Sequence, residues 1–246
     1  MLKFGFIKND GRLKKDTFNW TLYNLHYKGE LKESSKILTQ SLKSGDYQFR
    51  NSILTKTNEK MKPLHPNHRF LYETILQLNP SSIFEMGCGN GMHLHNLQIL
   101  LPSALLSGID LSNKQIKFLR QSYPDLKAEI KQADATIPFP PDFLPQADLA
   151  FTQAVIMHIH TGDLHLIALE NLFKMAKKYV LLFESAKNHN FMDDIKFLKE
   201  SGRIGWDKLF FHYRINEEIK TPASIICSRE QLNYPVLNNY NIYFNN

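Results

Sequence analysis

A glycine-rich turn between a buried strand and a helix is the feature that most limits what this chain can fold into. Residues Ser82–Met86 form a short apolar run bounded by turn residues, which is typical of a buried strand, and Gly87-Cys88-Gly89-Asn90-Gly91 follows directly. A helix is expected next, over Gly91–Leu101, because leucines recur at helical spacing and Pro102 follows. Glycines let the backbone approach a ligand closely, and the amides at a helix start favour polar or negative groups. The sequence therefore predicts a ligand site at the carboxyl end of the first strand of an α/β sheet.

Strands and helices alternate along the rest of the chain from Pro66 onward. Further strands are predicted over Leu105–Ile109, Ala128–Lys131, Asp148–Thr152 and Tyr179–Phe183, and helices around Leu71–Leu78, Ile116–Leu119 and Leu164–Met175. This alternation predicts an α/β fold with a doubly wound, mostly parallel sheet covered by helices on both faces. After Glu184 the pattern is less regular, and we expect a helix near Asp193–Lys199 and strands near Leu209–Arg214 and Ala223–Cys227.

The first 62 residues differ from the remainder in pattern and in charge. Leu31, Leu38 and Leu42 share one helical face that ends at Gly45, and the prolines of residues 62–66 interrupt the chain. The sequence predicts a partly helical N-terminal extension, residues 1–62, and a main domain, residues 63–246. Aromatic residues between positions 18 and 27 are expected to pack on the core, to form a lid over the ligand site or to line its pocket.

The basic excess of the protein lies in this extension. It holds 13 Lys and Arg against 6 Asp and Glu, whereas the whole chain has a net charge of +6. Such a segment can attract phosphates, an anionic sugar or nucleic acid, or it can simply be a solvated surface. Because no basic run is longer than Lys14-Lys15, a nucleic-acid partner is possible but not favoured.

Cysteine content and hydropathy indicate the cell compartment in which we expect the protein. Cys88 and Cys227 are too few for a disulfide framework and fit a reducing environment. The apolar stretches are far shorter than the roughly 20 residues of a membrane span, and the N-terminus lacks a signal-like apolar region. We expect a cytoplasmic protein without a membrane segment.

The spacing of the glycines and acids limits which class of ligand the site can bind. A dinucleotide fingerprint would need glycine at the position of Met92, which disfavours a nicotinamide enzyme, and the Gly-Lys-Ser/Thr of a phosphate loop is absent. Asp110 ends the second strand, where a carboxylate can accept hydrogen bonds from ribose hydroxyls. Asp134 follows the third strand and can accept from an adenine amino group. Together with the glycine turn, these acids predict an adenosine site.

Four segments in this order resemble class I S-adenosylmethionine-dependent methyltransferases: Ile83–Gly91, Gly108–Leu111, Ala133–Ala135 and Asp148–Ile159. The resemblance implies a Rossmann-like sheet of seven strands, the last antiparallel, with S-adenosyl-L-methionine as cofactor. In the family, the glycine turn holds the methionine moiety, the acid after strand two the ribose, and the strand-three motif the adenine. Carried over by position, the cofactor-binding residues are Glu85, Gly87, Cys88, Gly89, Gly91, Asp110, Leu111, Asp134, Ala135 and Gln153.

A second similarity concerns the segment that follows strand four. Residues Gln153–Leu164, together with Lys178–Glu184, are similar to methylases associated with pseudaminic-type sugar pathways. This similarity implies a sugar acceptor.

Methyl transfer from a sulfonium requires alignment and the exclusion of water, and a base helps where the acceptor is a hydroxyl. His158, which follows strand four, is the candidate catalytic residue, as base or acceptor contact, with His160 and Glu184 ranked below it. His158-x-His160 and His93-x-His95 lack a third ligand at a recognisable spacing, so no functional metal is expected.

Three functions stay open at this point. The chain is expected to be a methyltransferase for a small-molecule acceptor, such as a sugar or another anionic metabolite. Alternatively, it methylates RNA or protein and docks them on its basic N-terminus, or it binds the cofactor as a non-catalytic scaffold. The sequence indicates no oligomeric state.

Overall fold

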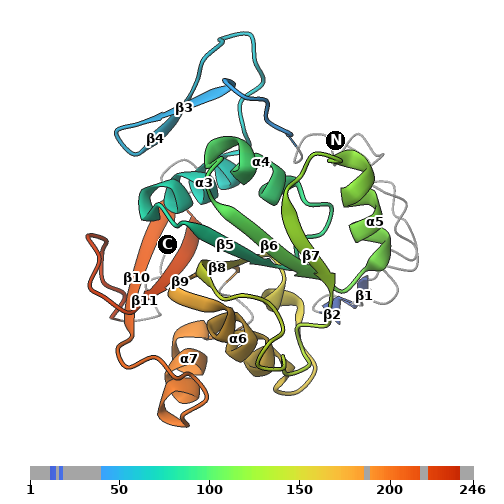
Figure 1. Cartoon of the computed structure of the whole chain (residues 1–246). Helices are drawn as coiled ribbons and strands as arrows, with labels where there is room; N and C mark the ends of the chain where they lie inside the picture. Colours follow the sequence, from blue (N-terminus) through green and yellow to red (C-terminus); the bar gives the residue numbers. More distant parts are fainter. Residues whose placement is uncertain (1–11, 15–16, 19–39, 186–188, 217–220, 239–246) are drawn as a thin grey trace.

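The computed structural model describes residues 12–14, 17–18, 40–185, 189–216 and 221–238, and a seven-stranded sheet between two layers of helices is its main feature (Figure 1). The strands are β5 (Ser82–Met86), β6 (Leu105–Asp110), β7 (Ala128–Gln132), β8 (Ala147–Gln153), β9 (Ala176–Phe183), β10 (Phe210–Asn216) and β11 (Thr221–Ser228).

The sheet has the order β10-β11-β9-β8-β5-β6-β7. The strands from β5 to β9 pair in parallel, and β11 is antiparallel to both β9 and β10. Within this sheet the chain enters at β5, continues through β6 to the edge strand β7, and then crosses back to β8, which lies on the other side of β5. This reversal next to β5 is the switch point of a doubly wound sheet, where ligands bind. The predicted fold class, including the antiparallel last strand, is confirmed.

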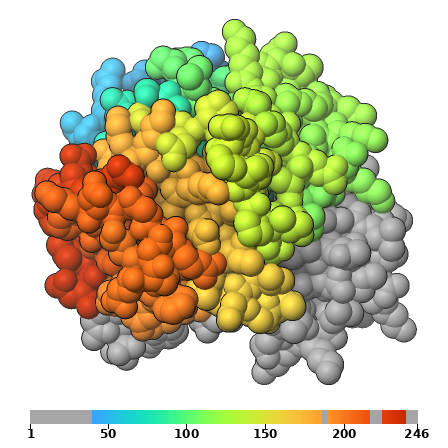
Figure 2. All heavy atoms as spheres, turned by 60° about the horizontal axis from the view of Figure 1, so that its bottom comes forward, coloured from blue at the N-terminus to red at the C-terminus, as the bar shows by residue number. Residues whose placement is uncertain are grey.

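Two groups of helices cover the two faces of the sheet. On one face lie α3 (Pro66–Leu78), α4 (Met92–Leu100) and α5 (Asn113–Ser122), and on the other lie α6 (Leu164–Met175) and α7 (Phe191–Glu200). Figure 2 views the molecule from the side of α6 and α7.

Successive residues of the central strands point into different cores. In β5, Ile83 belongs to the core under α3 and α4, whereas Phe84 belongs to the core under α6 and α7, and both are fully buried. Because side chains alternate across a strand, a strand buried on both faces is mostly apolar, and in β5 Glu85 is the one charged exception.

The described part of the N-terminal extension corrects one prediction. Residues 40–43 are not helical, and the chain continues as a hairpin of β3 (Tyr47–Arg50) and β4 (Ile53–Lys56). The turn of this hairpin is Asn51-Ser52, both with positive φ, and such a turn matches the twist of the paired strands. Leu42, placed on a helix by the sequence pattern, is instead buried in the core beside α3 and α4.

The other predictions for this region lie outside the described residues. Of positions 1–39, only the backbones of β1 (Arg12–Lys14) and β2 (Thr17–Phe18), which pair with each other, are described. The proposed helix face at Leu31 and Leu38 and the aromatic side chains of residues 18–27 therefore have no described structure.

The hairpin packs against α3. The Leu54 amide donates to Glu73 Oε1 at 3.0 Å, and the Tyr47 hydroxyl accepts from the Leu64 amide at 2.7 Å. Leu54 is only 2% exposed and shares the core of α3 and α4. Among the described residues, no helix combines the length and hydropathy that crossing a membrane requires.

Candidate functional site

The glycine turn links β5 to α4 and is packed on two sides. Gly87 and Gly91 have φ of +76° and +79°, a left-handed backbone that side chains disfavour. A Cβ on Gly87 would lie 2.4 Å from Val155 Cγ2, and one on Gly91 would lie 2.4 Å from Leu119 Cγ. Conformation and close approach therefore both require glycine, and the turn lies directly against the segment that follows β8.

Asp110 closes the turn from the end of β6. Its Oδ2 accepts from the Gly89 amide at 2.8 Å, and its Oδ1 accepts from the Ser112 amide at 2.7 Å. Burial raises the pKa of Asp110, while these two hydrogen bonds lower it. Each carboxylate oxygen has a second acceptor site, so Asp110 holds the turn in place and can still accept from a ligand hydroxyl.

Glu85 is a buried carboxyl group near the end of β5 with a raised pKa. It is 2% exposed, and within the described part of the chain its Oε2 has no hydrogen-bond partner. Burial and the nearby Asp110 raise the pKa of Glu85 well above its ordinary value. A buried polar atom without a partner at the carboxyl end of a central strand is a position that a polar ligand group would satisfy.

Cys88 lies inside the turn but is not a nucleophile. The residue is 4% exposed, and burial, followed by the charges of Glu85 and Asp110, raises the pKa of its thiol well above the ordinary value. A thiol that stays protonated is unreactive. Cys88 is therefore a small buried side chain of the turn and not a reactive group.

Gln153, at the end of β8, begins a chain of hydrogen bonds into the protein. Its Oε1 lies 3.2 Å from His93 Nε2, and His93 Nδ1 lies 2.8 Å from the Tyr72 hydroxyl, which in turn accepts from Asn96 Nδ2. Burial lowers the pKa of His93 to about 4, so its imidazole is neutral. This chain orients Gln153 beside the first turn of α4.

The remaining predicted residues follow β6 and β7. Leu111 is 40% exposed, so its side chain is accessible to a flat apolar ligand group. Asp134 Oδ1 accepts from the Thr136 amide and hydroxyl, and the Ala135 carbonyl accepts from Asn171 Nδ2. The Ala133 amide donates to the Asp110 carbonyl, so the ends of β6 and β7 are joined.

Glu184 holds the segment that carries His158. Its carboxylate accepts from the Thr152 hydroxyl and from the Val155 and Met157 amides, at 2.9 to 3.1 Å. These bonds order the short 3₁₀ helix η1 (Ile156–His158) against the end of β9. Both oxygens of Glu184 are thus occupied, and its contact with the backbone makes it a positioning group rather than the base considered from the sequence.

The histidine pairs that the sequence singled out do not converge. His93 is bonded to Tyr72 and Gln153, whereas His95 stacks on Tyr123 with ring centroids 4.2 Å apart. His160 stacks on His189, 5.7 Å away, instead of joining His158.

Two features of the site were missed by sequence reasoning. Ala154 has a φ of +53°, although it is not a glycine, and its amide donates to the Phe183 carbonyl. Val155, the next residue, covers Gly87. No sequence signal marks either role, because both depend on how β8 and β9 end side by side.

Comparisons with known proteins agree with this arrangement. Residues 84–183 match a family model described as a methyltransferase domain, which spans the strands from β5 to β9. No protein in a search of curated proteins matches the chain.

Several solved structures have a similar fold. One is a TehB-like S-adenosylmethionine-dependent methyltransferase from Corynebacterium glutamicum, with 15% identity and a TM-score of 0.50 over 69% of this chain and 90% of that one. Another is magnesium protoporphyrin IX methyltransferase from Synechocystis, with 15% identity and a TM-score of 0.50 over 67% of this chain and 80% of that one. A plantazolicin methyltransferase in complex with SAH has 24% identity and a TM-score of 0.40, and the chain spans 48% of its length.

Proposed function

We propose that this chain, a class I S-adenosylmethionine-dependent methyltransferase by its family match and its fold, transfers the methyl group to a small-molecule acceptor. The chain is a transferase, and its cofactor is S-adenosyl-L-methionine. The acceptor and the residues that act on it are the proposed part.

The observation that carries the proposal is the contact between the glycine turn and the segment after β8. Val155 lies over Gly87, and Glu184 holds the backbone from Val155 to Met157, so the turn and η1 form one unit. This arrangement supports a site in which cofactor and acceptor meet between the ends of β5 and β8.

The side chains near the turn fit the cofactor. Asp110 retains acceptor sites for ribose hydroxyls, the unpartnered Oε2 of Glu85 offers a polar contact, and the exposed Leu111 offers an apolar one. We assign Gly87, Gly89, Gly91 and Cys88 to the methionine end, Gln153 to the same end, and Asp134 with Ala135 to the adenine.

When bound, S-adenosylmethionine supplies a methyl group activated by its sulfonium. The residues of this chain then have to align the acceptor and exclude water. If the acceptor is a hydroxyl, its proton must leave, and His158 is the proposed base because Glu184 holds η1 in place.

A small acceptor is supported by the polar side chains around η1. His160 and His189 stack beside it, and the similarity of residues 153–164 to methylases of pseudaminic-type sugars, which stays a prediction, points to a sugar. RNA or protein remains the alternative acceptor, favoured only by the basic excess in the proposed extension, residues 1–62. We propose a cytoplasmic location, which the two buried free thiols support.

Calorimetric titration with S-adenosylmethionine and S-adenosylhomocysteine tests the cofactor site. Asp110→Ala is expected to weaken binding by about 1–3 kcal/mol, the cost of losing a buried polar partner. Asp142→Ala, which removes an exposed aspartate of the loop before β8, is the matched control and should bind like the wild type. Equal binding by both variants would contradict the assignment of Asp110.

Transfer of a labelled methyl group identifies the acceptor class. The full chain is incubated with labelled cofactor and either nucleotide sugars and small hydroxy acids, or RNA. Label in a small molecule, with kcat lowered by His158→Gln and KM little changed, supports the proposal. Label in RNA that disappears at high salt would replace it with the alternative. Cofactor binding without any transfer would favour a non-catalytic scaffold.

A further inference from the structure

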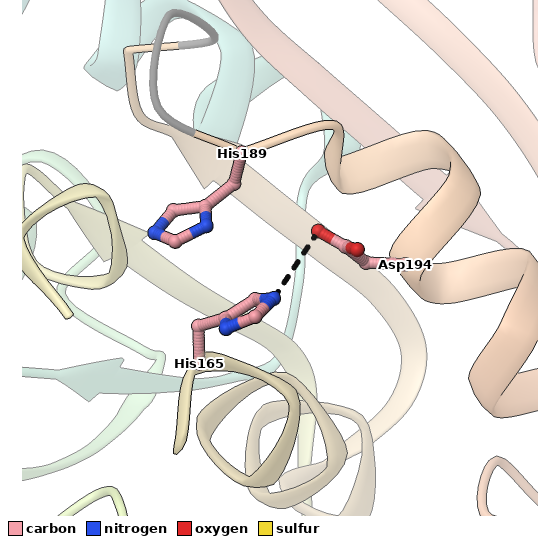
Figure 3. Close-up of side chains that lie close together, drawn as sticks. All are labelled: His165, His189 and Asp194. Atoms are coloured by element: carbon pink, nitrogen blue, oxygen red, sulfur yellow. Dashed lines mark ion pairs between the residues drawn. The ribbon is translucent and has the colours of Figure 1, made fainter. Parts of the chain in front are cut away.

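Three metal-ligating side chains from three different segments meet beside η1 (Figure 3). His165 is the second residue of α6, His189 follows β9, and Asp194 lies in the first turn of α7. One nitrogen or oxygen of each lies within 4.8 Å of those of the other two. The fold thus brings His165 together with two residues that lie 24 and 29 positions later in the sequence.

The rings and the carboxylate are closely arranged. His165 and His189 stack with centroids 4.3 Å apart and an angle of 17° between their planes. His165 Nε2 lies 3.7 Å from Asp194 Oδ2, a separation too long for a hydrogen bond. The side chains of His165 and Asp194 are only 14% and 23% exposed.

Two of the polar atoms in this cluster lack hydrogen bonds. Among the described residues, His165 Nδ1 and Asp194 Oδ2 are buried and have no hydrogen-bond partner. Buried nitrogen and oxygen atoms almost always have partners in folded proteins, so two unsatisfied ones within a single cluster require an explanation. A shared cation would satisfy them together.

The ring of His189 is held against the backbone near η1. It makes hydrogen bonds with the backbone at Ile159 and Ile156. Such outer contacts orient histidine ligands in metal sites.

We propose that His165, His189 and Asp194 form a binding site for a divalent transition metal of the Zn²⁺ type. Two imidazole nitrogens and one carboxylate oxygen suit such a metal, whereas Mg²⁺ and Ca²⁺ prefer oxygen alone. Zinc–ligand bonds of about 2.0–2.1 Å in a tetrahedron require the ligand atoms to lie about 3.4 Å apart, so the side chains close inward by an ångström or so.

The metal would connect three segments near the carboxyl ends of the strands. It would join the start of α6 and the start of α7 to the segment after β9. Three protein ligands leave a fourth position for water, as in zinc sites that take part in reactions. The site uses neither histidine pair that the sequence suggested, and it does not depend on the proposed acceptor.

Titration of the full, tag-free chain with Zn²⁺ after removal of metals by a chelator tests the proposal. The wild type should bind one Zn²⁺ per chain, and Co²⁺ should give the absorption bands of a tetrahedral nitrogen and oxygen site. Asp194→Asn and His165→Gln should each weaken Zn²⁺ binding at least 10-fold.

Asp193→Asn is the matched control. Asp193 is the neighbouring acid in the first turn of α7, and its side chain is 63% exposed, so this variant loses the same charge near the helix start. It should bind Zn²⁺ within threefold of the wild type. Circular dichroism of every variant verifies folding, and anomalous scattering at the zinc edge locates the metal in wild-type crystals.

Absence of Zn²⁺ binding by the wild type, tighter binding of Mg²⁺ than of Zn²⁺, or equal loss in Asp193→Asn and Asp194→Asn would overturn the proposal.

Discussion

Substitution of Gly87 by alanine measures how tightly the glycine turn is packed against the segment after β8. Two costs add in this variant. The left-handed φ of +76° costs an alanine about 1–2 kcal/mol. The added Cβ would lie 2.4 Å from Val155 Cγ2, and overpacking of this kind costs about 1–3 kcal/mol. We expect Gly87→Ala to lower the free energy of unfolding by about 2–5 kcal/mol.

A control variant and a second substitution separate the two costs. Gly202 has a φ of +75°, and a Cβ placed there would meet no atom within 4 Å, so Gly202→Ala should cost only about 1–2 kcal/mol. In Gly87→Ala with Val155→Ala the nearest remaining atom of residue 155 is its Cβ, at 3.3 Å, so the clash is relieved. A double-mutant cycle should therefore show a favourable coupling of about 1–3 kcal/mol.

Urea unfolding followed by circular dichroism gives these free energies. Equal costs for Gly87→Ala and Gly202→Ala, or no relief on adding Val155→Ala, would refute the packing described for the turn.

Three further predictions concern the same end of the sheet. Because burial raises the pKa of Glu85, the folded protein keeps a proton that the unfolded chain loses, so stability falls as pH rises from about 4 toward the folded-state pKa, by at most about 1.4 kcal/mol per unit from this group. Asp110 and Glu184 also have raised pKa values, so Glu85→Gln should reduce this slope in urea unfolding at several pH values without abolishing it, and an unchanged slope would contradict the prediction. Glu184→Ala leaves the Val155 and Met157 amides and the Thr152 hydroxyl without their acceptor; it should cost about 3–5 kcal/mol in the same assay, and a loss under 1 kcal/mol would contradict the role of Glu184. Ala154→Gly relieves a φ of +53° and should raise the free energy of unfolding by about 0.5–1 kcal/mol, as measured by calorimetry; a lower free energy of unfolding would contradict the strain inferred at this position.

The elements of the sheet were predictable because their signals are local. A strand buried on both faces is a continuous apolar run, and β5 and β8 were placed within one residue at each end. The start of α5 was readable from Ser112, whose hydroxyl accepts from the Gln115 amide. The left-handed turn before α4 was readable because glycine is the residue that this conformation selects.

The hairpin of β3 and β4 shows where local reading failed. Leucines at helical spacing predicted a helix that ends near Gly45, but residues 40–43 are not helical, and the strands at 47–50 and 53–56 were not predicted. The hairpin is stabilised by α3, which lies later in the chain, so its own residues carry only a weak signal for it.

The sequence alone predicted the α/β class, the glycine turn after β5 and the positions of Glu85 and Asp110 near the ends of β5 and β6, because strand ends and glycine turns are properties of neighbouring residues. Only the tertiary structure decided that Glu184 holds η1, that Val155 covers Gly87, and that His165, His189 and Asp194 meet. Apart from His189 and Asp194, which are 5 positions apart, these contacts join residues 24 to 68 positions apart. Their formation depends on which strands lie side by side and in which register, and no short stretch of sequence contains that information.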